Sequence, residues 1–209
     1  MMSSSDRPVA LVTGGSRGIG RAVCDDLVTT HSVLVGGRDA ESVGQVVEEL
    51  RAKGGQAHPF VADLTDDAST ADAVERVEHL LQQGLAVLVH SAGVARTGAL
   101  AELTREDWRH QYEVNVVAVA DLTRRLLPAL RAAGGTVVAI NSGSGHRSNP
   151  GGGSYAASKF ARSTLVGSIP TCRSSSRQAE AATTSPTTTS ALPRSRRPSG
   201  SRSMRHRRR

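Results

Sequence analysis

The segment that decides the fold reads Pro8-Val-Ala-Leu-Val-Thr13, followed at once by Gly14-Gly-Ser-Arg-Gly-Ile-Gly20. Its first half is a continuous apolar run, which predicts a buried strand, and residues 21–29 read as a helix. Glycines let backbone amides approach a pyrophosphate closely, and the amino terminus of a helix favours negative charge. The order of strand, glycine-rich turn and helix therefore predicts a nucleotide-binding unit, although a glycine-rich turn by itself is a weak signal.

The same alternation of apolar strand and helix continues along most of the chain. Further strands are expected at residues 32–36, 57–61, 86–90 and 136–140, and helices at residues 41–53, 65–83 and, as one or two helices, 103–133. Within residues 65–83 the apolar side chains that are spaced for one helix face are Val74, Val77, Leu80 and Leu81. Because this alternation is typical of a parallel sheet covered on both faces, the predicted fold class is α/β, with ligands at the carboxyl ends of the strands.

Composition narrows the class of protein further. Hydrophobic residues make up 38% of the 209 residues and aromatic residues only 2%, so the core is expected to consist of Val, Leu, Ala and Ile. Cys24 and Cys172 give neither a disulfide framework nor metal-ligand spacing, which is typical of a reducing compartment. The first residues lack the apolar run of a signal peptide, and no window approaches about 18 consecutive apolar residues. We therefore expect a cytoplasmic protein without a metal site or a membrane span.

The positive charge is concentrated at the end of the chain. Residues 171–209 carry ten arginines against one acidic residue, Glu180, a net charge of +9, whereas the whole chain carries +7. Residues 1–170 are therefore mildly acidic. Residues 171–209 contain no Val, Ile or Phe and a single Leu. Such a segment cannot bury enough apolar area to offset an ordering entropy of about 1–2 kcal/mol per residue, so we expect it to be disordered.

The candidate chemistry lies in the stretch from Ser142 to Lys159. Ser142 follows the predicted strand 136–140, and a glycine-rich loop leads from it to Tyr155, at the start of a helix. Tyr155 and Lys159 are four residues apart, so both side chains lie on one helix face. An ammonium beside a phenol favours the ionised phenol, and a nearby hydroxyl donor suits proton transfer to a carbonyl or alcohol oxygen. Taken singly, such a pair is more often a solvated face, and such a serine a turn residue or cap.

Together these motifs resemble those of the short-chain dehydrogenase/reductase family over about residues 8–165. The segment from Thr13 to Gly20, with the spacing Thr-Gly-x-x-x-Gly-x-Gly, looks like the cofactor turn of that family. Asp63 matches its acidic residue that contacts adenine, and Ser91-Ala-Gly93 matches its Asn-Ala-Gly element, with Ser91 in place of the usual Asn. The family's catalytic tetrad, including the thirteen-residue step from Ser to Tyr, is matched by Asn115, Ser142, Tyr155 and Lys159.

The resemblance implies a Rossmann-like, doubly wound sheet and hydride transfer between a nicotinamide cofactor and a small carbonyl or alcohol. In that case Tyr155 is the general acid in reduction or the base in oxidation. Lys159 favours the phenolate and binds the nicotinamide ribose, and Ser142 holds the substrate oxygen. Asn115 kinks its helix and holds a water for proton relay, the alternative being a surface amide. The implied cofactor-binding residues are Thr13, Gly14, Ser16, Arg17, Gly18, Ile19, Gly20, Arg38, Asp63, Leu64, Ser91, Ala92, Gly93, Tyr155 and Lys159.

The choice between NADP and NAD follows from charge. A carboxylate at the end of the second strand would accept a hydrogen bond from the ribose 2′-hydroxyl and repel a 2′-phosphate. Here that position is Gly37, Arg38 comes next, and Arg17 lies in the glycine turn. Two guanidiniums near the adenosine ribose favour a phosphate through charge-assisted hydrogen bonds, so NADP is predicted over NAD. The alternative is that Arg38 only starts the next helix.

After about Leu165 the resemblance ends. The family's Tyr-bearing helix is followed by further strands, a Pro-Gly element and a substrate-covering loop, whereas here a tract of Ser, Thr, Arg and Pro follows, as in a frame-shifted translation. We therefore expect a domain over residues 8–167 that lacks the C-terminal strands, with residues 1–7 and the basic tail 168–209 disordered. Shortened to about three turns, the Tyr-bearing helix loses packing, and weak or absent turnover is expected.

The sequence leaves two other functions open and suggests one mode of assembly. The first is a nucleotide-binding remnant without catalysis. The second is salt-dependent binding of nucleic acid by the arginine-rich tail, which is disfavoured because no aromatic residues interleave with the arginines. Members of the family often pair through the helices that here bear Asn115 and Tyr155, so a homo-oligomer through these helices is the expected assembly if one forms. The substrate and the direction of reaction are not specified by the sequence.

Overall fold

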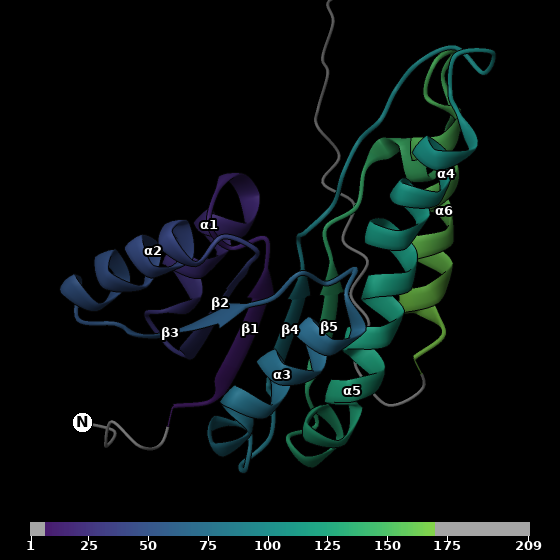
Figure 1. Ribbon diagram of the computed structural model, residues 1–209. Coiled ribbons are helices and arrows are strands. Elements are labelled where there is room, and N and C mark those ends of the chain that lie inside the picture. The colour runs from purple at the N-terminus through teal and green to yellow at the C-terminus, as the bar shows by residue number, and fades with distance from the viewer. Residues whose placement is uncertain (1–6, 170–209) are drawn as a thin grey trace, which may run out of the picture. The chain divides into compact units, whose positions relative to one another are not determined.

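The computed structural model describes residues 7–169, which form a parallel sheet with helices on both faces (Figure 1). The strand order is β3-β2-β1-β4-β5. The α/β fold class and its five parallel strands are therefore confirmed. Residues 1–6 and 170–209, which hold most of the two segments expected to be disordered, lie outside the described residues.

Four of the strands, β1, β2, β4 and β5, are mainly apolar, whereas β3 also contains Gln56, His58 and Pro59. The bounds are Val9–Thr13 for β1, Ser32–Gly37 for β2, Gln56–Val61 for β3, Val87–His90 for β4 and Thr136–Ala139 for β5. All five residues of β1 are buried, because β1 lies between β2 and β4. In the register, Leu11 pairs with Leu34 on one side and Leu88 on the other. These central strands are covered on both faces, which explains why they read as continuous apolar runs.

The helices lie between the strands, as the alternation predicted. They are α1 (Gly18–Leu27), α2 (Ala40–Ala52), α3 (Asp67–Val77), α4 (Arg105–Tyr112), α5 (Ala118–Ala132) and α6 (Gly153–Gly167), with a 3₁₀ turn η1 (Glu78–Leu80), a π-helical turn η2 (Glu113–Val117) and a 3₁₀ turn η3 (Gly143–Gly145). Several starts are fixed by side-chain caps, each worth about 1 kcal/mol. Asp39 caps α2, Asp66 caps α3, and Thr104 with Asp107 forms a capping box on α4.

Three helix predictions were inaccurate at their ends. The first helix, expected over 21–29, is α1 and spans Gly18–Leu27. The helix expected over 65–83 begins only after its cap Asp66 and gives way to η1 at Glu78. The chain then turns at Gly84, which has a φ of +96°. The helix bearing Tyr155 begins two residues earlier than expected and has 15 residues, about four turns. It is longer than expected because Val166, near its end, is buried in the core.

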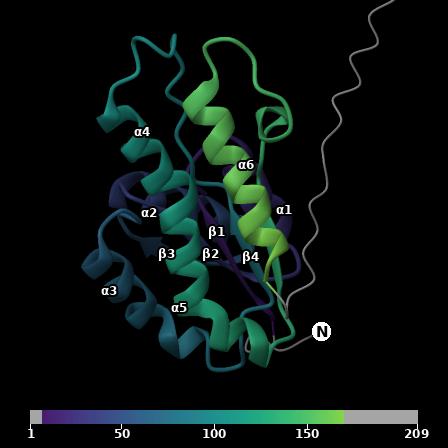
Figure 2. The ribbon, with the colours of Figure 1, turned by 90° about the vertical axis from the view of Figure 1, so that its right-hand side faces the viewer.

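Two apolar clusters hold the helices to the two faces of the sheet. One contains side chains of α3 and α5 and Val166 of α6 packed against Leu11, Leu34 and Leu88. The other contains side chains of α1 and α2 packed against Val12, Val33, Val35 and Val89. Figure 2 shows α4, α5 and α6 on the same side of the sheet. The described residues include no helix long and apolar enough to cross a membrane.

The topology decides where a ligand can bind. The chain leaves β1 towards β2 on one side and returns to β4 on the other, so the order of strands reverses at β1. In open parallel sheets, ligands bind at the carboxyl ends of the strands beside such a reversal. Within residues 7–169, β5 has one strand neighbour, β4, and its other edge carries no strand.

Candidate active site

The glycine turn after β1 is built so that it needs its glycines. Gly14 and Gly18 have φ values of +65° and +56°, in the left-handed region that favours glycine. A Cβ placed on Gly20 would lie 2.2 Å from the main-chain oxygen of Gly14. The turn therefore folds back tightly on itself before α1 starts. Arg17 and Ile19 are exposed at the amino terminus of α1, where backbone amides favour an anion.

Thr13 ties this turn to the segment after β4. Its Oγ1 accepts hydrogen bonds from the main-chain nitrogens of Ser91 and Ala92, each at 3.1 Å. The Ser91 hydroxyl oxygen would lie 3.1 Å from a Cβ on Gly20. The structure thus brings the predicted cofactor elements 13–20 and 91–93 together at the carboxyl ends of β1 and β4.

The predicted adenosine side of the site lies at the ends of β2 and β3. Arg38 is exposed just after β2, and Asp63 follows β3. The Asp63 carboxylate accepts hydrogen bonds from the backbone and hydroxyl of Thr65, at 3.0 and 2.8 Å, which lower its pKa, and the positive charge of Arg38 lowers it further. Arg38 is therefore close enough to Asp63 for their charges to interact. Leu64 is half-buried and packs against the core.

Asn115 lies in the π-helical turn η2 and is fully buried. Its Oδ1 accepts from the Val94 nitrogen at 3.0 Å, and its Nδ2 donates to the Val94 oxygen at 2.9 Å and to the Ser158 hydroxyl at 3.0 Å. A π turn widens a helix by one residue and is frequent at functional sites. Asn115 is therefore a buried connector between the segment after β4 and α6, and the alternative of a surface amide is wrong.

Tyr155 and Lys159 lie on one face of α6, as their spacing predicted. The Lys159 Nζ is 5.6 Å from the centre of the Tyr155 ring and donates to the Ile140 oxygen at 3.4 Å. A Cβ on Gly93 would lie 3.0 Å from Asn115 Oδ1 and 3.5 Å from Lys159 Nζ. Burial, and after it the positive charge of Arg162, lowers the Lys159 pKa to about 8. Lys159 therefore gives up its proton more readily than a solvent-exposed lysine does.

Ser142 and its neighbour Ser144 take different places. The Ser142 hydroxyl accepts from the Ser144 nitrogen at 3.2 Å and so caps the turn η3. Ser144, rather than Ser142, lines the cavity of about 490 Å³ that Tyr155 also lines. Two glycine-containing segments, 97–99 and 149–152, form the rest of its wall. Ser144 is thus a second hydroxyl beside Tyr155 that the thirteen-residue spacing could not identify.

Arg162 is the site residue that sequence reasoning missed. Its guanidinium is fully buried and donates to the main-chain oxygens of Ala92, at 3.0 Å, and His90. Its Nη1 would lie 3.6 Å from a Cβ on Gly93, next to Lys159 Nζ. In the sequence, the only indication that Arg162 faces the site was its spacing: it lies four residues after Ser158, which lies four after Ser154.

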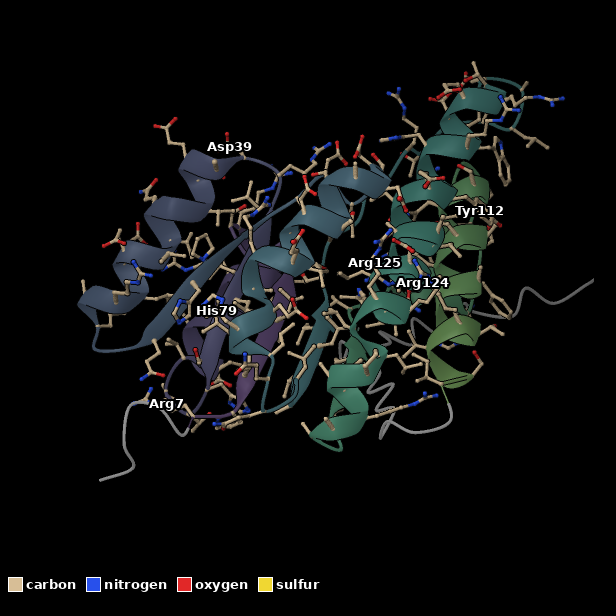
Figure 3. The ribbon with its side chains drawn as sticks, turned by 60° about the horizontal axis from the view of Figure 1, so that its bottom comes forward. Arg7, Asp39, His79, Tyr112, Arg124 and Arg125 are labelled. Atoms are coloured by element: carbon tan, nitrogen blue, oxygen red, sulfur yellow. The ribbon has the colours of Figure 1, made fainter. Side chains whose placement is uncertain are left out.

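A larger cavity lies at the opposite end of the strands, beside the amino-terminal ends of β1, β2 and β3. It has a volume of about 750 Å³, and its wall includes Arg7, His58 and His79, of which Figure 3 labels Arg7 and His79. It contains none of the predicted site residues. Among residues 7–169 no group of three or more His, Cys, Asp or Glu side chains is arranged to hold a metal ion.

Comparison with known proteins agrees with this arrangement. The family model for short chain dehydrogenases matches residues 8–174. The NADPH-dependent 3-dehydrocapnine reductase of Ornithobacterium rhinotracheale is 36% identical over 158 residues, which are 73% of this chain and 55% of the relative. The chain thus spans about half the length of that relative.

Solved structures show the same likeness. A metagenomic short-chain oxidoreductase in complex with NADP has 34% identity and a TM-score of 0.73, over 79% of this chain and 76% of the other. A 7α-hydroxysteroid dehydrogenase complexed with NADH has 28% identity and a TM-score of 0.70, over 79% and 66%. Since the family model covers most of the chain and the topology agrees, this chain belongs to the short-chain dehydrogenase/reductase family.

Proposed function

We propose that this chain is an NADP-dependent oxidoreductase that transfers hydride between NADP(H) and a small carbonyl or alcohol. The observation that carries the proposal is the convergence of Asn115 and Lys159 around Gly93, with Tyr155 beside Lys159 and facing a cavity. These groups come from η2, from α6 and from the segment after β4. Their gathering at the carboxyl edge of the sheet is what proton transfer at a substrate oxygen needs.

The residues present fit a dinucleotide. The left-handed glycines and the open start of α1 leave backbone amides free for a pyrophosphate, and Arg17 and Arg38 are both exposed near them. In the proposal these two arginines hold the 2′-phosphate, Asp63 and Leu64 border the adenine, and Ser91–Gly93 supports the adenosine. Tyr155 and Lys159 hold the nicotinamide ribose. When bound, the nicotinamide cofactor supplies or accepts the hydride.

The chain's own residues move the proton. In reduction, the Tyr155 hydroxyl donates its proton to the carbonyl oxygen as negative charge develops there. The ammonium of Lys159, held by the Ile140 oxygen, stabilises the resulting phenolate. Ser142 or Ser144 donates a hydrogen bond to the same substrate oxygen. Asn115 holds the Val94 main chain in place, which fixes one wall of the site.

NADPH binding and turnover test the proposal separately. We expect NADPH to raise the midpoint of thermal unfolding, and more so than NADH. A Tyr155→Phe variant should still bind NADPH, through the other cofactor-binding residues, but lose reductase activity by a factor of roughly 10²–10⁴ over a panel of small carbonyls. Tyr112→Phe is the matched control, since Tyr112 lies on α4 and stacks on Trp108. No shift with NADPH would reject the proposal, and equal activity of Tyr155→Phe would reject the role of Tyr155.

A second function, nucleotide binding without turnover, is favoured by one observation. In the described part of the chain, β5 has a free edge, and the Tyr155 cavity is lined by two loop segments, by Ser144 of η3 and by Tyr155 itself. The wall of the substrate half, as far as residues 7–169 form it, thus consists mainly of loops. An NADPH-induced thermal shift together with no detectable reduction of any carbonyl would select this second function.

A further inference from the structure

We propose that Arg162 is a positioning residue for the Tyr155–Lys159 pair: it fastens α6 to the end of β4 and fixes a second positive charge beside Lys159. The inference rests on the proposed function for its catalytic meaning, because only an enzyme of this kind uses the two side chains for proton transfer. The geometry itself is independent of any cofactor.

The first argument is the place of Arg162 in a row of buried polar side chains. Ser154, Ser158 and Arg162 lie four residues apart on α6, and all three are fully buried. Gln111 of α4 donates a hydrogen bond to the Ser154 hydroxyl, and Asn115 of η2 donates one to the Ser158 hydroxyl at 3.0 Å. We call this row the polar seam. Arg162 is its third member and extends it to the main chain after β4.

The second argument is the way in which the guanidinium is held. Arg162 donates to the oxygens of His90 and Ala92, two residues of the segment that also carries Gly93. Its Nε is buried and has no hydrogen-bond partner among residues 7–169, and no carboxylate in this range forms an ion pair with it. A buried cation without a counter-ion lowers stability relative to an apolar side chain. Stability therefore gives no reason for an arginine here.

The third argument is the electrostatic surroundings of Lys159. Lys159 lies beside the Tyr155 ring and interacts with the charge of Arg162, both residues being on α6. Arg162 in turn interacts with His90 at the end of β4. His90 is neutral, since burial lowers its pKa to about 3. Of the other elements packed on α6, β5 and η3 carry no ionisable side chain. On α4, Asp107 pairs with Arg96, and among residues 7–169 none of the other ionisable side chains of α4 (Arg105, Glu106, Arg109, His110 and Tyr112) forms an ion pair with Lys159 or Arg162. Glu113 of η2 forms no ion pair with Lys159 or Arg162 in the described residues.

The net effect is that two cations lie beside Tyr155, and no carboxylate among residues 7–169 forms an ion pair with either of them. Repulsion between Arg162 and Lys159 makes the ammonium a better proton donor. Arg162 thus acts on the reacting groups through its charge and through the position of α6, without facing the cavity that Tyr155 lines.

Lysine titration tests this directly, because the chain contains only two lysines, Lys53 and Lys159. Isotope-labelled lysine is incorporated into the full chain, Lys53→Arg assigns the two signals, and the titration of Lys159 is followed by NMR. In Arg162→Met, which keeps the bulk but not the charge, the Lys159 midpoint should rise by about one pH unit. Arg162→Gln, which keeps a hydrogen-bond donor for the carbonyl oxygens, should also raise the midpoint of the Lys159 titration. Arg76→Met is the matched control, an exposed arginine bound to the Val61 oxygen, and should leave Lys159 unchanged.

The outcomes separate this inference from the proposed function. An unchanged Lys159 midpoint in a folded Arg162→Met or Arg162→Gln protein overturns it. Failure of both variants to fold also overturns it, since the arginine would then serve folding alone. NADPH-induced thermal shifts on the same samples test the proposed function independently: a Lys159 shift without NADPH binding would support the electrostatic coupling and reject the enzyme.

Discussion

The Nδ2 of Asn115 donates to the Ser158 hydroxyl at 3.0 Å, which joins the π turn η2 to the helix that carries Tyr155 and Lys159. Ser158 in turn donates to the Tyr155 main-chain oxygen at 2.8 Å. The amide of Asn115 therefore acts on both sides of the site. It holds the main chain of Val94 and supports the first turns of α6.

Removing this amide should weaken the fold as well as the site. In Asn115→Ala the main-chain groups of Val94 and the hydroxyl of Ser158 lose their partner, and we expect the free energy of unfolding to fall by roughly 2–4 kcal/mol. Chemical denaturation measures the change. Asn149→Ala, at an exposed loop position, is the control and should change stability by less than about 0.5 kcal/mol. Equal effects of the two variants would show that the buried bonds of Asn115 contribute little.

A methyl group on Gly20 should disrupt the glycine turn. Because the added Cβ would lie 2.2 Å from the Gly14 oxygen, we expect Gly20→Ala to cost roughly 3 kcal/mol and to abolish the NADPH-induced thermal shift. Gly44→Ala is the matched control, since Gly44 lies within α2 with no atom within 4 Å of its added Cβ. It should stabilise the protein by about 0.5–1 kcal/mol. A stable Gly20→Ala protein that still binds NADPH would contradict the close packing of the turn.

The selectivity between NADPH and NADH should depend on Arg38. Without its guanidinium the 2′-phosphate loses a charge-assisted hydrogen bond, so Arg38→Gln should weaken NADPH binding by roughly tenfold to a hundredfold and leave NADH binding unchanged. Calorimetric titration with both cofactors measures the ratio. Arg131→Gln, an exposed arginine at the carboxyl end of α5, should change neither. If both cofactors lose affinity equally in Arg38→Gln, Arg38 only supports the start of α2.

His90 should make the fold sensitive to mild acid. Burial lowers its pKa from 6.5 to about 3, and its Nε2 lies 2.8 Å from the Thr123 hydroxyl. Between these values the unfolded chain binds a proton that the folded protein excludes. The free energy of unfolding should therefore fall as the pH falls from about 6.5 towards 3, by up to about 1.4 kcal/mol per pH unit.

Replacing the ring isolates this contribution from those of the carboxylates. In His90→Gln the free energy of unfolding should fall less steeply between pH 6 and 4. The decrease in slope should correspond to about one bound proton. His79→Gln, at an exposed histidine of η1, should leave the slope unchanged. The slope is measured by denaturation at a series of pH values. An identical slope in the wild type and His90→Gln would mean that the folded protein also protonates His90.

The sequence predicted the sheet well because most of its strands are separate apolar runs whose burial decides their conformation. It also predicted that Tyr155 and Lys159 share a helix face, because the period of a helix is fixed. It could not place Ser144, since the direction of a side chain in the loop after β5 depends on the turn η3. Arg162 was missed for a physical reason: an arginine on an amphipathic helix normally faces water, and only the contacts with Ala92 and His90 show that this one faces inward.

The polar seam has a consequence for how α6 can sit against its neighbours. Apolar side chains tolerate sliding, because one methyl contact is much like another, but hydrogen bonds require particular atoms at particular places. Rotating α6 by a single residue would break the bonds of Ser154, Ser158 and Arg162 at the same time. The three side chains therefore fix the rotation of α6 about its own axis. The direction in which the Tyr155 hydroxyl points is fixed with it.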